Sequence, residues 1–168
     1  MPSLVGSEMC IRDRFAAWED LHGRSLASAP LFASQTAVQL LDASSGARLT
    51  AAIDALAASY GAPKLIVIDT LNRNFGAGDE NSTADMTAFV AAVDRLRERF
   101  AGCTVLIVHH SGHGDKDRAR GSSVLRAALD TEYKVSKSGD AVTLTNHKMK
   151  DAPPPRAMAF AIVEAAGS

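Results

Sequence analysis

Two short apolar runs constrain the fold of this chain more than any other feature of its sequence. The first is Leu65–Thr70, in which four apolar residues precede Asp69, and the second is Val105–His110, which ends in two histidines. Unbroken β-branched runs of this length are typical of strands covered on both faces, as in parallel sheets flanked by helices. We therefore expect two strands that are buried on both faces and end in polar residues.

The segment between these runs has the periodicity of an amphipathic helix. From Asn81 to Phe100 the apolar residues recur three or four positions apart, and Ser82 followed by Asp85 is a pattern that caps a helix start. A strand, a helix and a strand in this order form a βαβ unit, and ligands of open α/β sheets bind at the carboxyl ends of the strands. The sequence thus predicts an α/β fold with a mostly parallel sheet, and it directs attention to Asp69 and His110.

The remaining segments predict further elements with turn or cap signals at their ends. These are a helix ending at Gly23, a strand over Pro30–Val38, a helix from about Ala47 to Gly61, a loop over 72–80, a short helix over Val124–Leu129, an antiparallel hairpin with arms at Glu132–Val135 and Ala141–Asn146, and a last strand over Ala157–Val163.

The composition excludes several classes of protein. A length of 168 residues with 46% hydrophobic residues allows one globular domain with a core, and a net charge of −1 limits any nucleic-acid contact to a local surface. No apolar stretch approaches the roughly 20 residues of a membrane span. Two cysteines, Cys10 and Cys103, are too few for a disulfide framework. We expect a soluble, cytoplasmic protein without a membrane partner.

Residues 1–14 are interpreted as an artefactual N-terminus. Residues 4–13, LVGSEMCIRD, resemble the translation of a transposon-based sequencing adapter, whose end GAG ATG TGT ATA AGA GAC AG encodes Glu8–Asp13 and the start of Arg14. The alternative is an ordinary flexible N-terminus, and nothing here forms the apolar core of a signal peptide. We therefore expect the natural protein to start further upstream.

An apolar strand that ends in a carboxylate has the form of a Walker B strand. In that role Asp69 holds Mg²⁺ through water, and the ion bridges the β- and γ-phosphates of ATP. The alternative is that Asp69 only caps the next loop. His109, His110 and His113 also suggest a zinc site, but adjacent strand residues point to opposite faces. A sensor of the γ-phosphate fits better, with one histidine in the crevice and the other packed locally.

Cations elsewhere in the chain have two interpretations each. Arg120 precedes the expected helix Val124–Leu129, where it either contacts a phosphate or lies in a solvated loop. Lys148 and Lys150 place two cations on one strand face, as an exposed edge or as a second phosphate contact.

In combination, Leu65–Phe75, Asp79–Ser82, Val105–Gly112 and Arg120–Leu125 resemble the RepA-like branch of RecA-type hexameric helicase ATPases, AAA-family proteins of plasmids and phages. The resemblance extends from Phe15 to about Pro153, and HHSG followed by RGSSVL is its most specific part. It implies a RecA-like P-loop NTPase core with a C-terminal antiparallel hairpin, a homo-oligomeric ring (a hexamer), ATP and Mg²⁺ as cofactors, and single-stranded DNA as a partner.

The resemblance also implies residue roles. Asp69 would be the Walker B carboxylate that holds Mg²⁺, His110 the γ-phosphate sensor, and Arg120 an arginine finger that reaches a neighbouring subunit. The residues implied at the nucleotide are Thr70, His109, Lys148 and Lys150, and those implied on DNA phosphates are Lys116 and Arg118.

One departure from the family pattern is large. The phosphate-binding loop, G-x-x-x-x-G-K-S/T, and the catalytic glutamate after the next strand are absent from the sequence. We expect both upstream of Phe15, so residues 15–168 are interpreted as the C-terminal two-thirds of a RecA-like ATPase domain that lacks its P-loop strand. The parent is expected to be active and these residues alone inactive.

Two other functions remain as alternatives. One is a regulatory RecA-fold protein that binds nucleotide without unwinding DNA. The other is a receiver-like signalling domain in which Asp69 accepts phosphate, which would require an acidic pair at an early strand end and a lysine closing a later strand; neither is evident.

Overall fold

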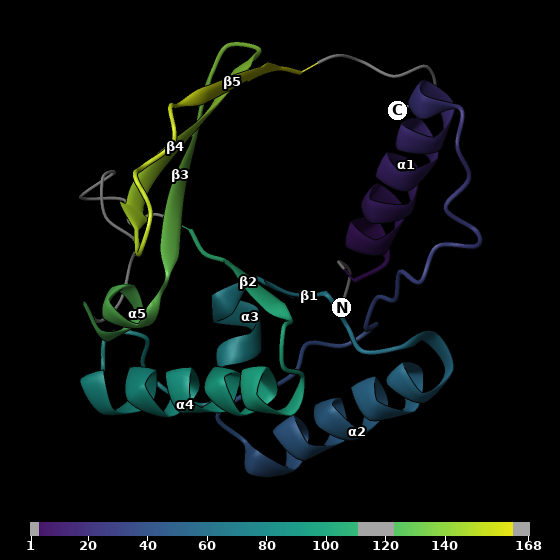
Figure 1. Ribbon diagram of the computed structural model, residues 1–168. Coiled ribbons are helices and arrows are strands. Elements are labelled where there is room, and N and C mark those ends of the chain that lie inside the picture. Colours follow the sequence, from purple (N-terminus) through teal and green to yellow (C-terminus); the bar gives the residue numbers. More distant parts are fainter. Residues whose placement is uncertain (1–3, 111–122, 163–168) are drawn as a thin grey trace. The chain divides into compact units, whose positions relative to one another are not determined.

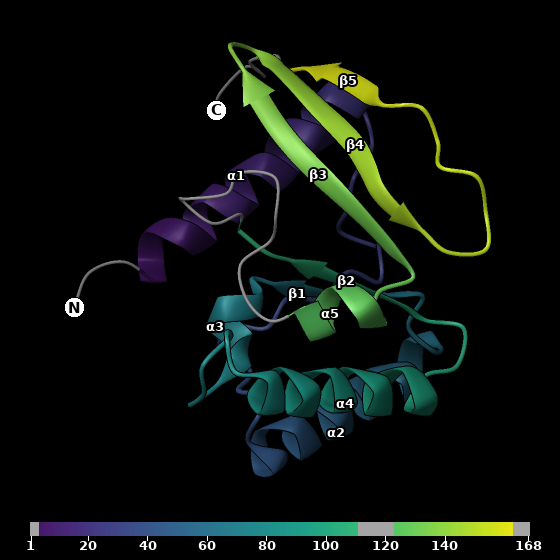
Figure 2. The same ribbon diagram turned by 90° about the vertical axis from the view of Figure 1, so that its left-hand side faces the viewer.

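The computed structural model describes residues 4–110 and 123–162 (Figures 1 and 2). The elements in chain order are α1 Leu4–His22, α2 Ala43–Tyr60, β1 Leu65–Asp69, α3 Leu71–Phe75, α4 Thr83–Arg99, β2 Thr104–Val108, α5 Ser123–Ala128, β3 Thr131–Ser138, β4 Ala141–Met149 and β5 Met158–Ala161. They divide into two compact units, Ser34–Leu129 on the one hand and Met1–Ala33 with Asp130–Ser168 on the other.

The predicted βαβ unit forms the centre of the Ser34–Leu129 unit. β1 and β2 pair in parallel, with Leu65 opposite Thr104 and Asp69 opposite Val108. α4 connects them, and its first turn is capped by Ser82, whose Oγ accepts a hydrogen bond from the Asp85 amide at 3.3 Å. The prediction of a mixed α/β fold with a parallel sheet is therefore confirmed, and both carboxyl ends lie at one edge.

Within the Ser34–Leu129 unit, the described residues cover only one face of this two-stranded sheet. In both views α2, α3, α4 and α5 lie on the same side of β1 and β2 (Figures 1 and 2). The residues on that side include Ile68 and Ile107, which pack in the core, whereas Val67 and Leu106 on the other side are about half exposed. The expectation of burial on both faces is wrong within this unit, because its described residues form no second layer over the outer face.

The core is built largely from α3 and α4. Met86 and Phe89 of α4 are fully buried against Leu71 and Phe75 of α3, and the Phe75 and Phe89 rings stack with centroids 5.2 Å apart. The sequence interpretation placed a loop over 72–80, and the structure corrects this with the helix α3. One helical turn brings Leu71 and Phe75 to the same side, where both enter the core.

Neighbouring residues of β2 offer a direct test of this one-sided burial. Leu106→Lys should change the free energy of unfolding by less than about 1 kcal/mol, because the lysine enters solvent on the outer face. Ile107→Lys should cost at least about 3 kcal/mol, because it places an unpaired charge against the core. Urea unfolding of the two variants compares them. Equal costs would contradict the assignment of the two faces.

The second unit contains a three-stranded antiparallel sheet in the order β3-β4-β5. The predicted hairpin is confirmed, and Gly139 at its turn has a φ of 59°, a conformation that glycine adopts without strain. β5 confirms the predicted last strand and pairs with Ala141–Leu144 of β4. β4 is therefore the central strand, but the half of it that contains Lys148 pairs only with β3, so the interpretation of Lys148 at an exposed edge stays a prediction.

The remaining predictions divide into confirmed and corrected ones. α1 ends at His22 before Gly23, as predicted, and α2 ends at Tyr60 before the predicted stop Gly61. α2 starts at Ala43, earlier than expected, because the Asp42 carboxylate accepts hydrogen bonds from the Ser44 and Ser45 amides. Residues 30–38, all of them described, form no strand. Instead the Ser34 hydroxyl bonds both the amide and the carbonyl of Thr36, a local turn that competes with a sheet ladder.

The N-terminal stretch interpreted as artefactual is largely helical. The interpretation of residues 1–14 as artefactual stays a prediction, and the helix α1 extends through residues 4–14 of that stretch. None of the helices in the described ranges is both long enough and apolar enough to cross a bilayer.

Candidate functional site

The polar residues that follow β1 and β2 lie at one edge of the parallel sheet. Asp69 is paired in register with Val108, so His109 and His110 begin directly beside the end of β1. The Asp69–Thr70 peptide bond is cis. The Thr70 carbonyl accepts hydrogen bonds from the Asn74 amide at 3.2 Å and from Asn74 Nδ2 at 2.9 Å, which ties the strand end to α3.

The alternation of side chains separates the two histidines. Asp69 continues the exposed row of β1 that contains Val67, and His110 follows the outer-face residue Val108 by two positions and is also exposed. His109 follows Ile107 by two positions, and only 9% of its side chain is exposed. Asp69 and His110 therefore share the open face at the sheet edge, whereas His109 turns toward the covered side.

Glu80 is a site residue that the sequence analysis quoted in a motif but gave no role. Its Oε1 accepts a hydrogen bond from Asn72 Nδ2 at 2.5 Å, and its Oε2 lies 4.0 Å from His109 Nε2. At this distance the two groups form an ion pair when the imidazole is protonated, but they are too far apart for a hydrogen bond. Glu80 thus joins α3, the loop before α4 and the end of β2.

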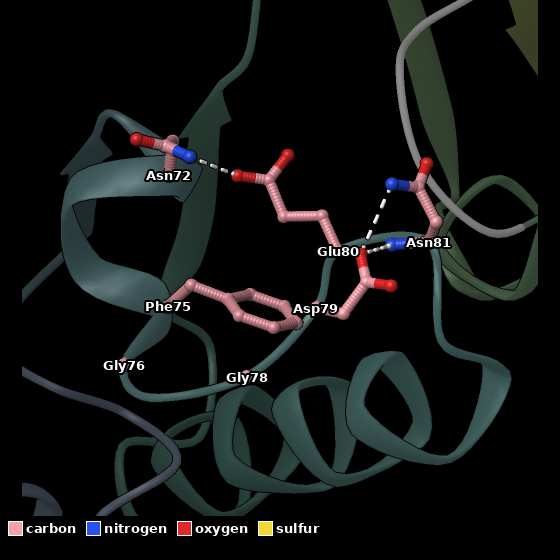
Figure 3. A pocket seen from close by; sticks show the side chains of 7 residues that line it. All are labelled: Asn72, Phe75, Gly76, Gly78, Asp79, Glu80 and Asn81. Atoms are coloured by element: carbon pink, nitrogen blue, oxygen red, sulfur yellow. Dashed lines mark hydrogen bonds between the residues drawn. The ribbon is translucent and has the colours of Figure 1, made fainter.

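A pocket of about 280 Å³ lies next to this contact, between α3 and the start of α4 (Figure 3). In Figure 3 the Glu80 carboxylate turns toward Asn72, and the Asp79 carboxylate turns toward the amide and side chain of Asn81. The other lining residues are Phe75, Gly76 and Gly78. Because its charged side chains are two carboxylates, the pocket does not suit the phosphates of a nucleotide.

Comparison with known families identifies the family of the chain. A model of the AAA domain matches residues 5–116, more than half of the chain and a range that contains β1, α4 and β2. The chain belongs to the AAA domain family. An AAA domain is an ATPase-type domain, and the family implies that nucleotide and Mg²⁺ bind. A search of curated proteins found no match.

The residues of this AAA domain fit the magnesium side of such a site. The Asp69 carboxylate is exposed at the strand end, and no described side chain is hydrogen bonded to it, so its oxygens can accept from the water ligands that Mg²⁺ keeps in proteins. Within the described ranges no three side chains from His, Cys, Asp and Glu form a metal-binding group. The pattern G-x-x-x-x-G-K-S/T of a phosphate-binding loop does not occur in the sequence.

The other predicted site residues belong to the second unit or fall outside the described residues. Lys148 of β4 is paired in register with Glu132, and Lys150, past the end of β4, has its Nζ 3.7 Å from Asp130 Oδ1. Both lysines belong to the second unit. The residues that fall outside the described ranges are Arg120, Lys116, Arg118 and His113.

The environment of the Cys103 thiol disfavours its ionised form. Cys103 precedes β2 at the end opposite to His109, and burial raises the pKa of its thiol despite a backbone hydrogen bond from Ile66 and the charge of Lys64. A thiol with a raised pKa stays protonated at neutral pH and is a poor nucleophile. Cys103 is therefore a poor candidate for a catalytic thiolate.

Proposed function

We propose that the chain is part of a DNA-dependent ATPase of the RepA-like helicase type, which hydrolyses ATP at interfaces between subunits. The observation that supports this most is the placement of Asp69 and His110 on one open face, at the carboxyl ends of neighbouring parallel strands. This is the edge where α/β sheets bind ligands. A carboxylate there can accept hydrogen bonds from water bound to Mg²⁺, and an imidazole can donate a hydrogen bond to the terminal phosphate of ATP.

Each residue has a defined task in this proposal. Asp69 accepts hydrogen bonds from the water ligands of Mg²⁺ and fixes their orientation. His110 donates a hydrogen bond to the γ-phosphate oxygen, and Thr70 lies next to Asp69 on the nucleotide side. Bound Mg²⁺ neutralises the charge that develops on the transferred phosphoryl group. The phosphate-binding loop and the catalytic glutamate are supplied by polypeptide outside these 168 residues.

The proposed assembly is a homo-oligomeric ring, with six subunits as in the resembling helicases. Arg120 of one subunit stabilises the transition state in its neighbour, with Lys148 and Lys150 at the same interface. Lys116 and Arg118 contact the phosphates of single-stranded DNA, and a local contact of this kind is compatible with the net charge of −1. The protein acts in the reducing cytoplasm.

The first test is the affinity for ATP of two versions of the protein. One is the 168-residue chain; the other, called the extended chain here, has residues 15–168 preceded by the natural upstream sequence of the same gene. With a fluorescent ATP analogue and Mg²⁺, the 168-residue chain should not bind below millimolar concentrations, because no backbone amides surround the phosphates. The extended chain should bind in the micromolar range typical of enzyme substrates.

Two outcomes would contradict the proposal. Tight Mg-ATP binding by the 168-residue chain would show that the phosphates are held by residues already present. Absence of ATP binding by the extended chain would refute the ATPase function itself. Strand displacement by an extended chain that does hydrolyse ATP then separates a helicase from the alternative, a regulatory nucleotide-binding protein that does not unwind DNA.

A further inference from the structure

We propose that Glu80 is a positioning residue of the nucleotide site, which holds His109 on the covered side of the sheet and thereby directs His110 to the open face. This inference rests on the proposed function, because it concerns how the γ-phosphate sensor is held. It assigns a role to the Glu80–His109 contact, in which neither residue contacts the nucleotide directly. Glu80 is also the point where three separate segments of the Ser34–Leu129 unit meet.

The contact between Glu80 and His109 is shielded from water. The side chains of His109 and Glu80 are only 9% and 15% exposed, so water screens their interaction little. Glu80 Oε1 is fixed by Asn72 Nδ2 at 2.5 Å, which leaves Oε2 facing the imidazole at 4.0 Å. A carboxylate that is held from one side and faces a buried ring on the other limits the positions that the ring can take.

The contact also affects the next residue, His110. β2 ends at Val108, and His109 and His110 directly follow it. Successive side chains of an extended segment point to opposite sides. When Glu80 holds His109 against the covered side, the backbone must present His110 to the open face, where Asp69 lies. Loss of the contact removes one of the restraints on the direction of both side chains.

The matched variants are Glu80→Gln and Asp79→Asn. A glutamine keeps the oxygen that accepts from Asn72 and the shape of the side chain. It removes the negative charge that faces the His109 imidazole. Asp79 is the neighbouring carboxylate, whose Oδ1 accepts from the amide and the side chain of Asn81 at 2.8 and 3.0 Å. An asparagine retains that acceptor, so Asp79→Asn controls for loss of a charge in the same loop.

The kinetic test uses the extended chain. Glu80→Gln should lower kcat by about 10- to 100-fold, the range seen when a supporting residue lets a reacting group shift. Its Kd for Mg-ATP should stay within about twofold, because the sensor acts mainly in the transition state. In a His110→Ala background the same substitution should cause no additional loss in single-turnover rate. Asp79→Asn should match the unsubstituted protein.

A spectroscopic test uses the 168-residue chain and does not depend on ATP hydrolysis. The chain has five histidines, whose imidazole signals can be assigned by single His→Gln substitutions. Glu80→Gln should shift the NMR signals of His109 and His110 while those of His22 and His147 stay in place, and Asp79→Asn should shift none. Unchanged His109 and His110 signals would overturn the proposal.

The outcomes separate this inference from the proposed function. If the unsubstituted extended chain hydrolyses ATP but Glu80→Gln does not slow it, the function stands and the inference is wrong. The inference is also wrong if Glu80→Gln lowers the rate by the same factor with and without His110, since Glu80 would then act independently. If the extended chain has no ATPase activity, the function fails and the role of Glu80 in it fails as well.

Discussion

Arg120→Ala in the extended chain should lower ATP turnover by about 10³- to 10⁵-fold while ATP affinity stays unchanged, the signature of an arginine finger that acts on a neighbouring subunit. The guanidinium enters the pocket of the next subunit and contacts charge that develops only in the transition state. Nucleotide binding, which is complete before that stage, should not need it. Steady-state turnover and the Kd of a fluorescent ATP analogue measure the two effects.

Mixing of subunits makes this prediction specific to action between subunits. An Arg120→Ala subunit combined with an Asp69→Asn subunit should recover part of the activity, because some interfaces then join an intact Asp69 pocket to an intact Arg120. A basal turnover that survives Arg120→Ala would refute the finger assignment. If only DNA stimulation is lost and the dependence of DNA binding on salt falls, Arg120 binds DNA phosphates instead.

Asp69→Asn should also lower turnover strongly, by about 10²-fold or more, because a metal that stabilises transition-state charge contributes several kcal/mol and each 1.36 kcal/mol is a factor of ten. The amide keeps the size of the side chain but loses the negative charge that orients the water ligands of Mg²⁺. The free energy of unfolding should be nearly unchanged, since the carboxylate is exposed and no described side chain bonds to it.

The control for Asp69→Asn is Asp94→Asn on α4. The Asp94 side chain is half exposed, and its Oδ1 lies 3.6 Å from Arg97 Nη1. Such a surface ion pair contributes little to stability. Turnover of this variant should equal that of the unsubstituted extended chain. An equal loss in both variants would point to general charge effects rather than to a metal site.

The strands and the long helix were predictable because each has a local signal. Leu65–Asp69 is a continuous apolar run, α4 repeats its apolar residues at helical spacing, and Ser82 marks the start of α4. The parallel pairing was predicted from the order of strand, helix and strand. The hairpin β3–β4 alternates around Gly139 and was predictable for the same reason.

Features that depend on tertiary contacts were not predictable from the sequence. The sequence of an apolar run such as Leu65–Asp69 does not show whether one or both faces of the strand are covered. In the Ser34–Leu129 unit the described residues cover only one face of the sheet. α3 was missed because its five residues are too few for a periodic pattern, and its helical form is set by the burial of Leu71 and Phe75. The local turn at Ser34 replaced the strand expected over Pro30–Val38.

The candidate site shows the same division. Asp69 and His110 could be found because they end predicted strands, and the sheet register places them at one edge. The contact of Glu80 with His109 joins residues 29 positions apart, so its only sequence signal was the Asp79–Ser82 motif, which gives no partner. Alternation predicts that the two histidines face opposite sides, but it does not tell which one faces the open side. The burial of the His109 side chain decides this.

Binding of Mn²⁺ in place of Mg²⁺ tests most directly whether Asp69 holds the metal of an ATP site. In the extended chain saturated with a non-hydrolysable ATP analogue, electron paramagnetic resonance measures how much Mn²⁺ leaves the free aqueous pool. We predict tight Mn²⁺ binding by the unsubstituted protein and by Asp94→Asn, and at least about tenfold weaker binding by Asp69→Asn, equivalent to about 1.4 kcal/mol. Equal Mn²⁺ affinity in all three proteins would contradict the account.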